Sequence, residues 1–320
     1  MNTPIFNQLY WLVKREYWEN RGGFLRAPLI TGGIFLLLNL MGIITGEVMR
    51  VRHGIASNNL GLFNRALADG DLAKVGTGLD IMMFSTSALI SLVLGFVVFF
   101  YCLGALYDDR RDRSILFWKS LPVSDTATVL SKVLAATVLA PAIAVVCGVV
   151  TGFLMLLSYA VVLAFHGIGI WHLLTLAHPF RVAGALIGTI PLYFLWALPT
   201  LGWLLLCSAW SRSKPFLWAV ALPIATGVVL SWFNLLGTVG GSVWYWQHIA
   251  SRALLGVFPG GWLGQVNLAS MHGDMDQAMD FLYLNHSYSV LATPAVWIGT
   301  AAGAAMIAGA IWLRRWRDDS

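Results

Sequence analysis

The chain has 320 residues, of which 58% are hydrophobic and only 11% are charged. A soluble domain carries roughly 25% charged residues, because a polar surface must cover its core. This composition excludes an ordinary soluble protein and predicts an all-α membrane protein with a single transmembrane domain over residues 1–320. The formal net charge of +5 does not indicate nucleic-acid binding, because the basic residues are spread over short segments between apolar runs.

Residues 3–20 have the pattern of an amphipathic helix. Apolar residues recur at three- and four-residue spacing, at Phe6, Leu9, Val13 and Tyr17. Charged residues between positions 14 and 19 are expected on the opposite side. Such a helix can lie in the membrane interface, and packing against the protein itself is the alternative.

Six apolar stretches follow, each long enough to cross a hydrocarbon core, which takes about 20 helical residues. Their approximate limits are 27–46, 81–107, 129–165, 182–210, 216–236 and 290–313. We expect Pro141 to kink the third stretch. The three cysteines, Cys102, Cys147 and Cys207, lie within these stretches and are interpreted as small core residues.

Lysine and arginine are unevenly divided between the two sets of connecting segments. Of the 20, fourteen lie in the N-terminal segment, the second-to-third loop, the fourth-to-fifth loop and the C-terminal segment. The positive-inside rule places this richer set in the cytoplasm. We therefore expect a plasma-membrane protein, in a bacterial inner membrane, with both termini cytoplasmic.

The longest segment on the other side covers residues 237–289 and is rich in tryptophan and other aromatic residues. Its part from Ala253 to Leu268 is too short, and too interrupted by glycine, to cross the membrane. A re-entrant or interfacial segment before the last span suits it. Anchoring by interfacial aromatic residues is the simpler interpretation.

The chemistry that the sequence lacks is also informative. It contains no Gly-Lys pair and hence no phosphate loop, no H-E-x-x-H zinc motif and no G-x-S-x-G nucleophile turn. We expect no catalytic residues, no metal site and no cofactor in this chain, although His272 near Asp274 and Asp276 leaves outer metal binding open. Ionisable residues are missing from the six apolar cores, which argues against an ion-coupled carrier.

The inner segment from Tyr107 to Lys132 carries the strongest functional signal. After the charged run Asp108–Arg113, an apolar cluster lies where the chain is expected to face water: Ile115, Leu116, Phe117 and Trp118. A charged rim around exposed apolar residues indicates a partner surface, and a short helix on the inner leaflet is the alternative. Ser124 or Asp125 suits the N-cap of the next helix.

This segment resembles the permease subunits of export-type (type-two) ABC transporters. In that family the corresponding loop often ends in a leucine-proline-x-serine element followed by a lysine, and here these residues are Leu121, Pro122, Val123, Ser124 and Lys132. The layout also fits, with an amphipathic first helix, six spans and a long outer segment before the last span. The resemblance covers nearly the whole chain, mostly as architecture.

The resemblance implies that loop 108–126 forms a cytoplasmic coupling helix that docks on a separate ATPase subunit. The implied ATPase-coupling residues are Arg111, Arg113, Ile115, Leu116, Phe117, Trp118 and Lys119. The N-terminal helix offers a second contact, at Lys14, Arg15 and Glu16. Two ATPase copies would hold ATP and magnesium, and a second permease copy would form a homodimer.

The sequence does not identify a cargo. If cargo passes between two copies, small and aromatic residues of the second and fifth spans line its route, with Ser85, Ser87, Ser91, Trp232 and Asn234 as candidates. Helix packing explains these residues equally well. The alternatives to an exporter permease are an ATP-independent secondary carrier and a membrane assembly factor. Membrane lipids are the other expected partners.

Overall fold

The computed structural model describes residues 5–52, 72–112, 123–165, 176–237, 240–265 and 284–316. All regular elements in these ranges are helical. Six helical stretches are long and apolar enough to cross a membrane, namely Gly22–Met49, Val75–Arg111, Asp125–Val162, Pro179–Trp210, Leu217–Leu235 and Pro294–Trp316. Each overlaps one predicted stretch, so the prediction of an all-α membrane protein with six candidate spans is confirmed for the described residues.

The N-terminal half contains α1 (Ile5–Glu19), the π turn η1 (Gly22–Arg26), α2 (Ala27–Arg52), α4 (Leu72–Gly104), α5 (Tyr107–Arg111), α7 (Asp125–Leu134), η3 (Ala135–Leu139) and α8 (Ala140–Phe165). The C-terminal half contains α10 (Pro179–Trp210), η4 (Leu217–Ala221), α11 (Leu222–Leu235), α12 (Ser242–Tyr245), η5 (Trp246–Ala250), α13 (Ser251–Leu254), η6 (Gly261–Gln265), α15 (Leu284–Ser289), η8 (Val290–Ala292) and α16 (Pro294–Trp316).

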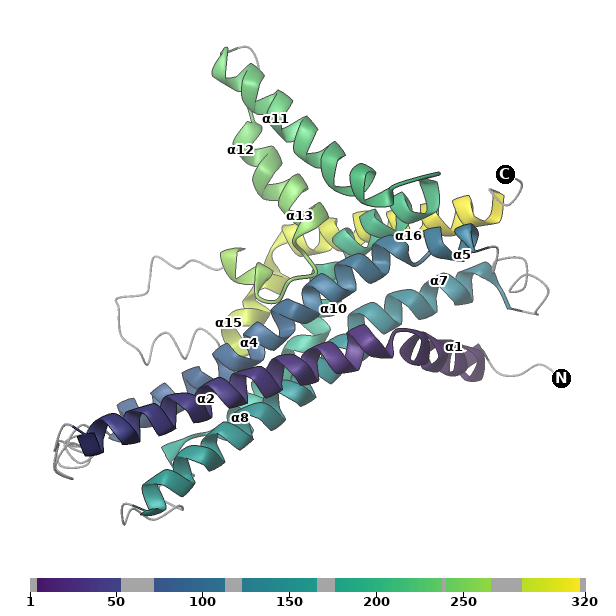
Figure 1. Ribbon diagram of the computed structural model, residues 1–320. Coiled ribbons are helices and arrows are strands. Elements are labelled where there is room, and N and C mark those ends of the chain that lie inside the picture. The colour runs from purple at the N-terminus through teal and green to yellow at the C-terminus, as the bar shows by residue number, and fades with distance from the viewer. Residues whose placement is uncertain are drawn as a thin grey trace.

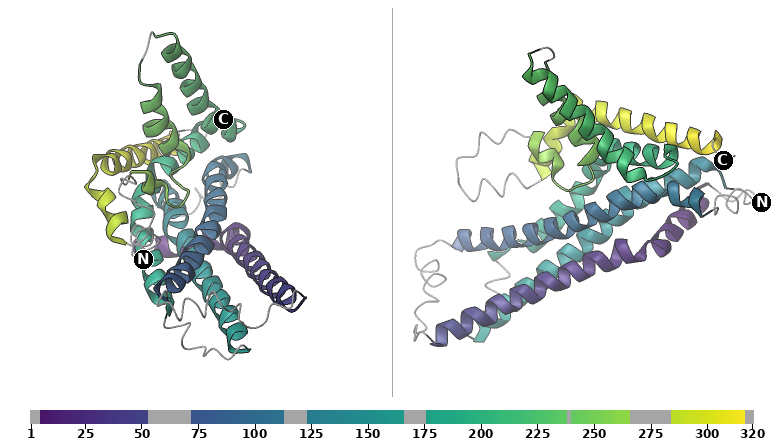
Figure 2. Two further views of the ribbon diagram at one scale, coloured as in Figure 1. Left: turned by 90° about the vertical axis from the view of Figure 1, so that its left-hand side faces the viewer. Right: turned by 45° about the horizontal axis from the view of Figure 1, so that its top comes forward.

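Helices α2, α4, α8 and α10 form a bundle, and α16 packs along α10 (Figure 1). Helix α1, helix α5, the start of α7 and the end of α16 gather at one end of this bundle (Figures 1 and 2). We refer to this end as the inner end. An even number of spans requires the first and last helices to begin and finish on one side, and the arrangement meets that requirement.

Helix α11 diverges from the bundle, and residues 242–254 return beside it toward α10 (Figures 1 and 2). Three hydrogen bonds join the two arms: Asn234 Nδ2 to Ser242 Oγ (2.9 Å), Trp246 Nε1 to Ser231 Oγ (2.9 Å) and Tyr245 OH to the Pro223 carbonyl (2.9 Å). The chain turns at Gly241, whose φ of 94° favours glycine. The helical part that returns toward α10 therefore begins at Ser242, well before residues 253–268, where the sequence predicted a re-entrant or interfacial segment.

Each of three prolines in the candidate spans follows a π turn by two residues. Pro28 follows η1, Pro141 follows η3 and Pro223 follows η4. A proline ring clashes with the carbonyl four residues earlier, and the wider π turn relieves that clash. The kink expected at Pro141 thus takes the form of a π turn.

Side chains of neighbouring helices bond the carbonyls that two prolines leave free. The indole of Trp203 donates to the Ala219 carbonyl (2.9 Å), four residues before Pro223. Thr300 Oγ1 donates to the Leu195 carbonyl (3.3 Å), four residues before Pro199. Within a membrane no water replaces these bonds, so each one ties two helices together.

The backbones of helices α10 and α16 approach each other closely at Gly202 and Gly303. A methyl group added at Gly303 would lie 2.5 Å from the carbonyl carbon and oxygen of Leu198, which are backbone atoms that cannot turn aside. A methyl group at Gly202 would meet the Gly303 carbonyl oxygen at 2.5 Å. Small residues that let two backbones approach are the usual basis of helix packing in membranes.

We expect Gly303→Ala to destabilise the fold by about 1–3 kcal/mol, because the added methyl forces α10 and α16 apart. The measurement is thermal unfolding of the purified chain in detergent. Gly33→Ala is the matched control, since a methyl at Gly33 meets no atom within 4 Å. Replacing a glycine inside a helix with alanine increases stability by about 0.5–1 kcal/mol. The Gly33→Ala control is therefore expected to be as stable as the wild-type chain or slightly more stable. Equal melting temperatures for the two variants contradict the close approach.

Within its apolar span, helix α2 makes a polar contact with the bundle. Asn39 Nδ2 donates to the Tyr159 hydroxyl (2.8 Å), and Ser158 Oγ donates to Asn39 Oδ1 (3.0 Å). Only 11% of the most apolar part of this span is buried. Asn39 therefore connects α2 to α8 by hydrogen bonds, which explains why a polar side chain lies inside a span.

Candidate functional site

A cluster of charged side chains lies at the inner end, where α1, α4, α5, α7 and α16 meet. Three of its members are almost completely enclosed: Glu16 is 0% exposed, Lys132 4% and Arg314 5%. Charged residues are rarely buried unless they are paired. We call this set the inner ion network, comprising Arg15, Glu16, Tyr101, Asp109, Asp125, Lys132 and Arg314.

Glu16 is the centre of one half of the network. Its Oε1 lies 2.6 Å from Arg15 Nη2 and 3.3 Å from Lys132 Nζ, and its Oε2 accepts a 2.7 Å hydrogen bond from the Tyr101 hydroxyl. Burial by itself raises the pKa of Glu16. The Lys132 ammonium, the Tyr101 hydrogen bond and Arg15 outweigh burial and hold the pKa below its ordinary value.

The burial of Glu16 corrects the sequence-based picture of residues 3–20. Leu12 and Glu16 are one helical turn apart, and both face α7, whereas Tyr10, Trp11 and Trp18 are exposed. Lys14 lies over the Trp11 ring at 4.7 Å and Arg21 over the Trp18 ring at 5.5 Å. The sequence predicted that Glu16 lies on the polar, water-facing side of this helix. It lies on the buried side instead, where its ion pairs with Arg15 and Lys132 compensate the cost of burial.

Arg314 is the centre of the other half. Its Nη1 lies 3.1 Å from Asp109 Oδ2, and its Nε lies 3.1 Å from Asp125 Oδ1. Lys132 Nζ is 3.6 Å from the same Asp109 oxygen, which joins the two halves. Asp109 and Asp125 stand on either side of residues 113–122, so one guanidinium holds both ends of that loop.

The two loop ends are also positioned locally. Ser124 has extended backbone angles and its Oγ accepts a 3.1 Å hydrogen bond from the Ala127 amide, so Ser124 is the N-cap of α7. Asp125 is therefore in the first helical turn, where a carboxylate is favoured. At the other end, the Leu106 and Tyr107 amides donate to Ser208 Oγ at the end of α10 (3.1 and 2.9 Å).

The named charges balance, with Glu16, Asp109 and Asp125 against Arg15, Lys132 and Arg314. Burying such charges gains little net stability, but removing one partner leaves an uncompensated charge at high cost. The network therefore selects one arrangement of five helices. Within the described ranges, no group of three His, Cys, Asp or Glu side chains has the geometry of a metal site.

Most of the implied coupling residues cannot be placed against this network. Arg113, Ile115, Leu116, Phe117, Trp118 and Lys119 lie outside the described residues. Arg111 is described and is exposed at the end of α5, next to that loop. Of the implied contacts on α1, Lys14 is exposed, Arg15 is half-buried and Glu16 is enclosed.

The residues suggested for a cargo route do not converge within one chain. Ser87 is buried against Gly148 of α8, whereas Ser85 is exposed and bonds the Met82 carbonyl of its own helix. Ser91 is half-buried and lines a small cavity together with residues of α8 and α10. Trp232 and Asn234 are exposed on α11, which stands away from the bundle (Figure 2). Helix packing accounts for Ser87, and the route itself stays a prediction.

Sequence reasoning did not single out Tyr101, Asp109, Asp125 or Arg314 as members of one site. The sequence placed the three charged residues on the side predicted to be cytoplasmic, but it did not indicate that they contact one another. Their joint position follows from the packing of α16 beside α7, which no local pattern reveals.

No protein-family model, no curated protein and no solved structure matches this chain. What the chain does is therefore inferred from its own residues and their geometry.

Proposed function

We propose that this chain is the permease subunit of an ATP-driven exporter in a bacterial inner membrane, with both termini in the cytoplasm. Loop 108–126 docks on a separate ATPase subunit, and two such subunits bind ATP and magnesium. A second copy of the permease completes the assembly. The observation that supports this most is the contact of Arg314 with Asp109 and Asp125, because it connects both ends of the loop to the last span.

The inner ion network gives a physical route for the movement. When the ATPase subunits close on ATP, they displace the docked loop. Arg314 passes that displacement to α16, and Lys132 passes it through Asp109 and Glu16 to α1. Closely packed helices move as rigid bodies between discrete arrangements, so a shift at the loop becomes a tilt of whole spans. Glu16 acts inside the chain, while Lys14 and Arg111 are exposed for contact with the partner.

An external energy source is favoured by the position of the acidic residues. In the described ranges, the Asp and Glu side chains lie toward helix ends, and the one farthest inside a span is Asp80, eight residues after the start of α4 and 3.2 Å from His178 Nδ1. A carrier driven by protons or sodium commonly places a carboxylate midway along a span, where the coupling ion binds. No described carboxylate occupies such a position.

The direct test is to purify the tagged chain from its native membrane in mild detergent, identify co-purifying proteins and assay vanadate-sensitive ATP hydrolysis. The proposal predicts a stoichiometric partner with a phosphate loop, together with hydrolysis. A chain that purifies alone and hydrolyses no ATP, from membranes that express its neighbouring genes, points instead to a secondary carrier or an assembly factor.

Trp118→Ala is expected to weaken ATPase docking by about 2 kcal/mol or more, because buried tryptophans dominate the energy of protein interfaces. The fold is expected to be unchanged, because the ion pairs described for the inner ion network join residues outside 113–122. The measurements are the amount of co-purified ATPase and the melting temperature of the permease. Normal ATPase recovery with normal coupled transport contradicts the assignment of Trp118.

A further inference from the structure

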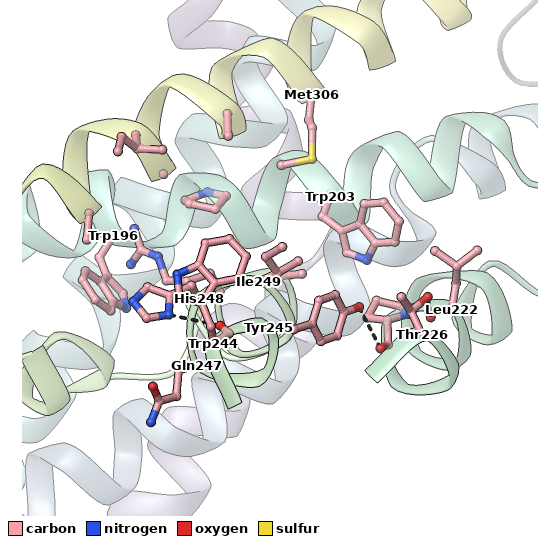
Figure 3. Close-up of a pocket in the computed structure, with 18 residues that line it drawn as sticks. Trp196, Trp203, Leu222, Thr226, Trp244, Tyr245, Gln247, His248, Ile249 and Met306 are labelled. Atoms are coloured by element: carbon pink, nitrogen blue, oxygen red, sulfur yellow. Dashed lines mark hydrogen bonds between the residues drawn. The ribbon is translucent and has the colours of Figure 1, made fainter. Parts of the chain in front are cut away.

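A half-open cavity of about 740 Å³ lies between α10, α16, α11 and the returning residues 242–254. Figure 3 shows Trp196, Trp244 and His248 at one end and Trp203, Tyr245 and Leu222 at the other. Helix α16 contributes Ala295, Gly299 and Ala302, which repeat on one helical face. Their small side chains leave the space open, and the wall is almost entirely apolar.

The cavity wall contains Arg252, whose charge has no acidic partner in the described part of the chain. Its guanidinium lies 3.6 Å from the Trp196 ring, and its Nη1 and Nη2 are shielded from solvent with no hydrogen-bond acceptor among the described residues. The sequence contains no Asp or Glu from position 126 to position 273. A stacked indole stabilises a cation in part, but it satisfies none of the N–H donors.

Arg252 lies deep along the helices that surround it. Trp196, on which it stacks, is twelve residues before Ser208 at the inner end of α10, which corresponds to about 18 Å. Gly299, against which its Nη2 packs, is fifteen residues before Arg314, or about 22 Å. A hydrocarbon core is about 30 Å thick, so a cation at this depth is costly and marks a functional position.

The position of Arg252 is built into the fold. Thr200 Oγ1, completely buried on α10, donates to the Arg252 carbonyl (2.6 Å) and accepts from the Gly256 amide (2.9 Å). The Tyr193 hydroxyl donates to the Val257 carbonyl (2.9 Å). A side chain at position 299 would strike Nη2, so the glycine there leaves room for the guanidinium.

We propose that this cavity binds an anionic phospholipid, with its phosphate at Arg252 and an acyl chain along the apolar wall. The phosphate oxygens supply the acceptors that the guanidinium lacks, and arginine suits phosphate because its donors form a planar fork. A small hydrated anion would bind less well than a phospholipid, because the apolar wall does not replace the water that the anion loses on entering the cavity. A lipid reaches the site sideways from the bilayer, between α11 and α16, both of which line the cavity.

The test is native mass spectrometry of the purified full-length chain with phosphatidylglycerol or phosphatidylcholine of identical acyl chains. The wild-type chain is expected to retain phosphatidylglycerol about tenfold more strongly, because both lipids offer a phosphate but the choline ammonium adds a second cation beside Arg252. Arg252→Gln abolishes this preference, while Arg252→Lys keeps part of it. Arg212→Gln, which removes an exposed arginine outside the cavity, leaves the preference unchanged.

A second variant keeps the charge and fills the space. Ala302→Phe occupies the cavity and is expected to lower the retention of both lipids. Equal binding of the two lipids by the wild-type chain overturns the proposal, and so does a preference that survives Arg252→Gln or binding that survives Ala302→Phe. These measurements need no ATPase, so their outcome is independent of the proposed exporter function.

Discussion

Replacing Arg314 with methionine is expected to destabilise the folded chain by about 3–5 kcal/mol. Methionine retains much of the side-chain volume but leaves Asp109 and Asp125 without the guanidinium that both contact at 3.1 Å. Removing one partner of a buried ion pair is costly because the remaining charge stays enclosed. Denaturant or thermal unfolding in detergent gives the difference in free energy.

The neighbouring residue gives a matched control for Arg314. Arg315 has the same chemistry and is exposed, so Arg315→Met is expected to change stability by no more than about 0.5 kcal/mol. The double variant Arg314→Met with Asp125→Asn is expected to lose less than the sum of the two single changes, because both remove the same contact. Strict additivity, or equal effects at 314 and 315, contradicts the described geometry.

Glu16→Gln is the second change with a large expected effect, also of about 3–5 kcal/mol. It removes the anion that Lys132, Arg15 and the Tyr101 hydroxyl share, so the enclosed Lys132 and the half-buried Arg15 both lose a neutralising partner. Glu19→Gln is the control, because the Glu19 side chain is 52% exposed. A Glu16→Gln variant as stable as its control shows that the network is not formed.

The effect of Glu16 also has a defined dependence on pH. The folded chain holds the pKa of Glu16 below its ordinary value of 4.5, so the unfolded chain binds the proton more readily. The stability that Glu16 contributes is therefore complete well above pH 4.5 and is lost as the pH falls through the lowered folded pKa. The free-energy difference between wild-type and Glu16→Gln is expected to be constant near neutral pH and to shrink in acid. A difference that grows in acid contradicts the ion pairing.

The six spans could be predicted from the sequence because each depends on local composition. A run of about 20 apolar residues leaves a helix in the bilayer as the only structure that satisfies its backbone. The N-cap of α7 also depends on local sequence, which predicted Ser124 or Asp125. The Ser124 side chain accepts the capping hydrogen bond. Pro141 predicted a kink in its helix, but the sequence did not predict the π turn that accommodates the proline ring.

The inner ion network could not be predicted, because its contacts join distant parts of the chain. Arg314 meets Asp125 and Asp109 across 189 and 205 residues. Glu16 was misplaced because amphipathic patterns assume that charged residues face water, and they contain no information about a buried partner such as Lys132. Arg252 was counted among outer loop residues, since nothing local indicates that residues 242–254 return to pack on α10.

The most direct test of the exporter proposal is photocrosslinking from position 118 in the native membrane. A photoreactive amino acid replaces Trp118 in one sample and the exposed Leu235 of α11 in a second, and the crosslinked proteins are identified by mass spectrometry. The account predicts that position 118 captures a protein with a phosphate loop and that position 235 does not. Capture of only lipid or of unrelated proteins at 118, with no ATPase, contradicts it.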